Sequence, residues 1–229
     1  MVPRMDERKL CAVEFTGFGE HAIDFFDGLV VDNSKAFWED NKHVYQSDVR
    51  APMEALLAEL EPEFGKGKVF RPYRDVRFSK DKTPYKDHCG GVVELGRGGG
   101  AHYVQVGTAG LFVAGGSFAM ASDQIARYRE SVTDDLRGQA LEKILRKLAK
   151  QGWELRGDKL KRAPKGVDPE HPRVELAKHK RLYVAKVWPP DDTLHEPECL
   201  DRVRTAWREV NPLVDWCADH IGVTEVGFR

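Results

Sequence analysis

The chain has 229 residues, of which 41% are hydrophobic and 32% are charged. This is the composition of an ordinary globular protein, and it excludes disordered, collagen-like and coiled-coil chains. The 36 basic and 37 acidic side chains give a formal net charge of −1, which argues against a generally basic protein that coats nucleic acid.

Helices are predicted in the first quarter of the chain. Apolar residues recur every three or four positions over 22–30, and Ser34 is a suitable N-cap for a second helix over 34–45. A third apolar stripe runs over 49–64, with Pro52 in the first turn. These stripes predict three helices that contribute to the core.

The middle of the chain changes to the short apolar runs of β-strands. Runs at 92–95, 102–107 and 111–115 are separated by glycine-rich turns and predict an antiparallel meander. Helical periodicity returns over 122–130 and 134–150.

One more strand is predicted at 182–188, and a last helical stripe follows over 200–221, where Pro212 is expected to kink or divide the helix. Without repeated strand–helix–strand units, the order favours an α+β fold: a central antiparallel meander flanked by N- and C-terminal helices. We expect a single domain over 15–222, an N-terminal extension (1–14) and a C-terminal tail (223–229).

The positive charge is concentrated in two segments. Residues 65–88, the first basic segment, and residues 155–181, the second basic segment, each have a net charge of +5, whereas the rest of the chain sums to −11. Such a contrast favours a focused positive site that attracts a small anion.

The first basic segment has cations every two to four residues among aromatic residues. If 73–79 is extended, Arg74, Val76 and Phe78 face the core, and Arg74 then needs a carboxylate or an anionic ligand; Asp75 would serve Arg77 in the same way. The alternative is a solvated loop with structural Arg–carboxylate pairs. The candidate anion ligands are Arg71, Arg74, Arg77, Lys80, Lys82 and Lys86.

The same segment contains the motif YRDVRFSKDKTPYK at 73–86, which resembles the bacterial and fungal family called domain of unknown function 2461. Matching residues also include Asn33-Ser34-Lys35, Phe37-Trp38, Asn41-Lys42, His88, Gly90, Gly115-Gly116, Arg127, and 160–166 with Asp168, His171 and Pro172. The resemblance spans about residues 15–220 and implies one α+β domain without an established activity. A family signature so rich in Arg and Lys favours a shared anionic ligand over shared packing.

Two further groups of residues are candidates for the same site. We expect the pocket wall to include Asn33, Lys35, Trp38 and Asn41. The second basic segment is rich in turn-forming residues and predicts a loop. This loop is either a long surface connection or a lid that contributes Lys161, Arg162, Lys165 and His171.

Three functions remain open at this point. The first is binding of a small phosphorylated or carboxylated molecule, and the second is an enzyme that acts on such a molecule with His88 or Asp75 as general acid or base. The third, nucleic-acid binding, is disfavoured by the acidic remainder of the chain. The oligomeric state, the ligand and the reaction stay open.

Other site chemistries have no support in the sequence. The cysteines form no C-x-x-C pair, and no cluster of ligand residues predicts a metal or a cofactor. No apolar run approaches the roughly 18 residues of a membrane span, and the N-terminus has no signal-peptide core. We therefore expect a cytoplasmic protein.

Overall fold

The computed structural model describes residues 14–77 and 79–226. The expected N-terminal extension lies outside the described residues except for residue 14, as does the end of the expected tail, 227–229. Phe78, expected to face the core, lies outside them as well.

A six-stranded antiparallel sheet forms the centre of the fold, with the strand order β1-β2-β3-β4-β6-β5. The α+β prediction and its meander, β2-β3-β4, are therefore confirmed. The two outer strands were not predicted, because two or three residues are too few to show an alternating pattern. The strands are β1 (Lys68–Val69), β2 (His88–Glu94), β3 (Ala101–Gly107), β4 (Gly110–Ser117), β5 (Glu154–Arg156) and β6 (Leu182–Trp188).

The N-terminal helices are α1 (Ala22–Val31), α2 (Lys35–Val44) and α3 (Ala51–Phe64). The backbone N–H of Phe37 donates to Ser34 Oγ at 3.1 Å, which confirms the predicted cap. The second and third helices are not separate, because a π-helical segment, Tyr45–Arg50, joins α2 directly to α3.

The later helices are α4 (Ser122–Thr133), α5 (Asp135–Lys150), the short α6 (Val174–Ala177), a 3-10 turn at Asp192–His195, and α7 (Glu198–His220). The expected division at Pro212 is wrong, because α7 continues through this residue. Proline removes one backbone hydrogen bond, but Val210, Leu213 and Val214 beside it are fully buried. The packing of this apolar stripe against the sheet offsets the local cost.

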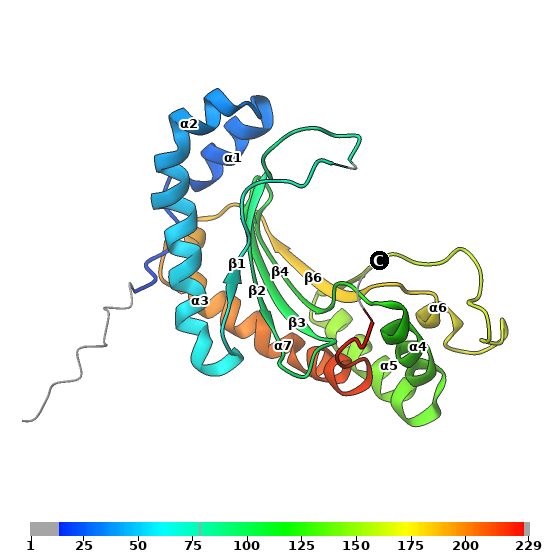
Figure 1. Cartoon of the computed structure of the whole chain (residues 1–229). Helices are drawn as coiled ribbons and strands as arrows, with labels where there is room; N and C mark the ends of the chain where they lie inside the picture. Colours follow the sequence, from blue (N-terminus) through cyan, green and yellow to red (C-terminus); the bar gives the residue numbers. More distant parts are fainter. Residues whose placement is uncertain (1–13, 78, 227–229) are drawn as a thin grey trace, which may run out of the picture.

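Helices α1, α3 and α7 pack on the same face of the sheet, whereas much of its concave face is left open (Figure 1). Helix α7 approaches β4 so closely that a Cβ on Gly115 would lie 2.5 Å from Val210 Cγ2. On β3, Val104 and Val106 are fully buried, while Tyr103 and Gln105 between them are half-buried on the opposite face. The open face therefore carries partly exposed side chains that differ from the buried valines of the core face.

The buried side chains join one hydrophobic cluster that extends from Phe15 to Ile221. Within 14–77 and 79–226, no helix is both long enough and apolar enough to span a membrane.

Candidate functional site

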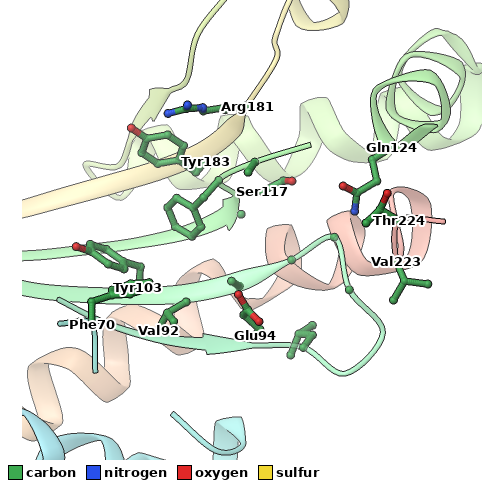
Figure 2. Close-up of a pocket in the computed structure, with 18 of the residues that line it drawn as sticks. Phe70, Val92, Glu94, Tyr103, Ser117, Gln124, Arg181, Tyr183, Val223 and Thr224 are labelled. Atoms are coloured by element: carbon green, nitrogen blue, oxygen red, sulfur yellow. The ribbon is translucent and has the colours of Figure 1, made fainter. Parts of the chain in front are cut away.

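The open face of the sheet is hollowed into a cleft of about 940 Å³. This volume lies within the range of roughly 300–1,000 Å³ that is usual for small-molecule sites. Figure 2 shows Phe70 and Tyr103 on one side of the cleft and Arg181 and Tyr183 on the other. The cleft is thus bounded by residues that lie far apart in the sequence.

Aromatic side chains dominate the cleft. They come from four different parts of the sheet: Phe70, Tyr103, Phe112, Phe118 and Tyr183. All five are half-buried. Sequence reasoning missed this cluster, although Tyr103 and Phe112 each alternate with buried valine or leucine along a predicted strand, which contained a signal for a second strand face.

The far end of the cleft is closed by the segment 221–226 after α7, of which Val223 and Thr224 line the cleft (Figure 2). Arg127 on α4 donates to the carbonyls of Ile221 and Val223, at 2.7 and 2.5 Å. Asp123 accepts hydrogen bonds from the Glu225 N–H and the Thr224 hydroxyl, which hold the pKa of Asp123 at about 2. The first residues of the expected tail are therefore a fixed wall of the cleft.

The other end of the cleft meets the loop 71–87, which connects β1 to β2. The condition that 73–79 is an extended strand is not met, because in the described part of this stretch only Tyr73 forms a bridge, with Tyr85. The backbone N–H groups of Arg74 and Lys86 donate to Pro84 O and Pro72 O, both at 2.8 Å. These bonds close the base of the loop, while the described residues of its tip form no helix or strand.

The two central arginines of this loop pair with carboxylates of the loop itself. Arg74 hydrogen-bonds to Asp81 and Thr83, and Arg77 contacts Asp75 at 2.7 Å. Hydrogen bonds from Thr83 and Arg74 hold the pKa of Asp81 at about 2, and those from Arg77 hold the pKa of Asp75 at about 2. The pairing of Arg77 with Asp75 is as expected.

The lysines of the loop differ in their surroundings. Lys82 Nζ donates to Val76 O at 2.9 Å, within the loop tip, and Lys80 is exposed. Lys86 Nζ donates to Arg71 O at 2.9 Å and lies 5.2 Å from the centroid of the Phe70 ring, at the edge of the cleft.

Two of the expected wall residues fix the position of the loop. Asn33 Nδ2 donates to Tyr85 O at 3.2 Å, and Tyr85 N–H donates back to Asn33 Oδ1 at 3.0 Å. Trp38 is buried and stacks on the Tyr85 ring, with centroids 4.4 Å apart. Lys35 is exposed, and Asn41 donates to Phe37 O within its own helix.

A smaller pocket of about 450 Å³ lies beside the cleft and is lined by Asn33, Arg74, Lys86 and His88, among others. The structure therefore brings together three expected site residues from the first basic segment and one expected wall residue. His88 lines both this pocket and the cleft.

His88 is paired with a residue that sequence reasoning did not select. Its Nδ1 lies 2.8 Å from Asp87 Oδ1, and its side chain is 31% exposed. The next residue, Cys89, points to the opposite face, where it is buried and accepts a hydrogen bond from Tyr45 at 3.7 Å. Burial raises the pKa of the Cys89 thiol to about 11, so a thiolate is disfavoured there.

The second basic segment forms a long loop over 157–173, as predicted, apart from a bridge between Lys159 and His179. Figure 1 shows this loop beside α6, away from the loop 71–87 above the sheet. The residues lining the cleft do not include the expected lid residues, Lys161, Arg162, Lys165 and His171; this segment contributes Arg181 at its end. His171 Nδ1 instead accepts a hydrogen bond from the Arg173 N–H at 3.0 Å.

The described residues contain no group of three or more His, Cys, Asp and Glu side chains that could hold a metal ion. Among known proteins, the model of a family described as conserved hypothetical protein (DUF2461) matches residues 21–216. A search of curated proteins and a search of solved structures gave no match.

Proposed function

The chain belongs to the DUF2461 family of conserved hypothetical proteins, and from this premise we propose that it binds a small phosphorylated or carboxylated molecule. The body of the ligand lies in the cleft over the sheet. Its anionic group lies at the end of the cleft, near Arg71, Lys86 and His88.

The environment of Lys86 carries this proposal. Burial lowers the pKa of Lys86 from its usual value, and the positive charge of Arg71 lowers it further. No ion pair joins Lys86 or Arg71 to a carboxylate within 14–77 and 79–226, and the protein partner of Lys86 Nζ is a carbonyl oxygen. An anion bound here would relieve the repulsion between two like charges at the edge of a low-dielectric cleft.

The pairing of the other cations also supports this position. Arg74 and Arg77 are neutralised by Asp81 and Asp75, so their charges are already balanced inside the loop. The proposed anion site is therefore smaller than the six cations expected from the sequence. A long polyanion stays disfavoured, because the acidic remainder of the chain would repel it beyond the cleft.

The test compares two variants with the same change of charge in the same loop. Lys86→Gln removes the ammonium at the cleft, whereas Lys80→Gln removes an exposed one at the loop tip. Isothermal titration with ribose 5-phosphate and with citrate should show binding to the parent protein and to Lys80→Gln, and at least tenfold weaker binding to Lys86→Gln. Equal effects of the two substitutions, or the absence of binding by every anion tested, would refute the proposal.

One observation favours an enzyme as the second candidate. Asp87 holds one nitrogen of His88, and His88 lines the cleft, which is the arrangement of a histidine oriented for proton transfer. Asp75, the other expected acid or base, is held by Arg77 with a pKa of about 2, so His88 is the better candidate. The experiment is to incubate the protein with any phosphate ester that binds: His88→Ala should abolish turnover while leaving affinity nearly unchanged, and equal loss of both would remove this assignment.

A further inference from the structure

The aromatic side chains of the cleft form a continuous path across the sheet. The Phe70 ring lies 6.3 Å from that of Tyr103, Tyr103 lies 5.8 Å from Phe118, and Phe118 lies 4.9 Å from Tyr183. Lys86 Nζ lies over the first ring of this path, at 5.2 Å from its centroid. The Phe70 ring therefore lies between the proposed anion site and Tyr103, the second ring of the path.

The strand register places small residues beside these rings. On the open face, Gly116 is paired with Tyr183 on one side and with Ala101 on the other, and both small residues line the cleft. Small residues thus form part of the floor of the cleft beside the aromatic side chains. The planes of the Phe118 and Tyr183 rings are inclined to each other by only 37°. Aromatic rings that stand over a floor of Ala and Gly suit a flat guest better than a globular one.

Polar groups among the rings indicate a heteroaromatic guest rather than an alkyl chain. The Tyr103 hydroxyl donates to Gln105 Oε1 at 2.8 Å. This bond leaves the amide N–H groups of Gln105, which also lines the cleft, as donors to a ring nitrogen or carbonyl.

We infer, resting on the proposed function, that the ligand carries a flat heteroaromatic ring, as a nucleoside monophosphate does. The ring stacks among Tyr103, Phe118 and Tyr183, and the phosphate lies at Lys86. Base–aromatic stacking tolerates different bases because each has a π face, so the preference is for the class of ligand and not for one base.

The test distinguishes the contribution of the ring to the binding affinity from that of the anionic group. The full chain is titrated by isothermal calorimetry with compounds that differ in the group attached to the phosphate, or that lack the phosphate. They are the four ribonucleoside 5′-monophosphates, ribose 5-phosphate, octyl phosphate and the four nucleosides. At least one nucleotide should bind roughly tenfold or more tightly than ribose 5-phosphate and more tightly than octyl phosphate. Phe118→Leu should abolish this preference without weakening ribose 5-phosphate, and Phe118→Tyr, which keeps the ring, should retain it.

The outcomes distinguish the two proposals. If ribose 5-phosphate or octyl phosphate binds as tightly as every nucleotide, the ring inference is overturned while anion binding stands. If nucleosides bind as tightly as nucleotides and Lys86→Gln has no effect, anion binding fails and the stacking site stands. If none of these compounds binds, both proposals fail.

Discussion

Replacing Asn33 should release the basic loop without unfolding the protein. Its side-chain amide makes two hydrogen bonds to the backbone of Tyr85, at 3.2 and 3.0 Å, and so ties the loop 71–87 to the turn between α1 and α2. Asn33→Ala removes both bonds. At a net value of roughly 0.5–1.5 kcal/mol each, their loss should favour opening of the loop by about 2 kcal/mol, or roughly 30-fold.

Hydrogen exchange measures this opening directly. The amides of Arg74, Tyr85 and Lys86 donate to Pro84 O, Asn33 Oδ1 and Pro72 O. In Asn33→Ala they should exchange roughly 30-fold faster, whereas the amides of β3 in the centre of the sheet should keep their rates because they open only with larger parts of the fold. Asn33→Asp keeps the acceptor for Tyr85 N–H but loses the donor, so it should have an intermediate effect.

Asn41→Ala is the matched control. Asn41 also donates its amide to a backbone carbonyl, Phe37 O, at 2.9 Å, but within α2 and away from the loop. Asn41→Ala should therefore leave hydrogen exchange in the loop 71–87 unchanged. The reasoning would be refuted if Asn33→Ala and Asn41→Ala had the same effect on the loop, or if Asn33→Ala accelerated the amides of β3 as much as those of the loop.

Further substitutions test the core and the cleft. Trp38→Ala should lower the free energy of unfolding by about 3–5 kcal/mol in urea titrations, because the side chain is 1% exposed; a loss below about 1 kcal/mol would contradict this. Gly90→Ala places a Cβ 2.3 Å from the Tyr103 hydroxyl, so the ring must turn into the cleft; we expect about 1–3 kcal/mol of destabilisation and weaker ligand binding in titrations, and unchanged affinity would argue against this cleft. Burial lowers the pKa of His102 to about 4, so the unfolded chain takes up this proton near pH 6.5 and the native state only near pH 4; stability should therefore fall as the pH drops through this window. Urea titrations at pH 7 and pH 5 should show a smaller fall for His102→Leu than for the exposed control His43→Gln, and equal falls would refute the assignment.

Local patterns in the sequence predicted most of the elements. The three-and-four spacing of apolar residues predicted the helices, because one face of each must be buried whatever it packs against. Ser34 marked the start of α2 because a cap acts within one turn. The pairing of Asp75 with Arg77 was also foreseen, because these residues are two positions apart.

The sequence did not predict, or predicted wrongly, the features that depend on contacts with distant residues. Strands β1 and β5 have two and three residues and exist because β2 and β6 pair with them. Pro212 was expected to kink or divide a helix, and burial against the sheet keeps that helix undivided. In both cases the deciding energy comes from tertiary contacts, which local propensity does not contain.

The features of the candidate site also fall into those that the sequence predicts and those that depend on the tertiary structure. The sequence by itself determined where the positive charge is concentrated, that a loop carries much of it, and that His88 follows that loop. Only the tertiary structure decided which cations are already paired, that Lys86 lies over Phe70, and that the concave face is left open with Tyr103 and Tyr183 lining one cleft. The physical reason is that charge and periodicity are properties of neighbouring residues, whereas a cleft arises where packed elements leave part of one face uncovered.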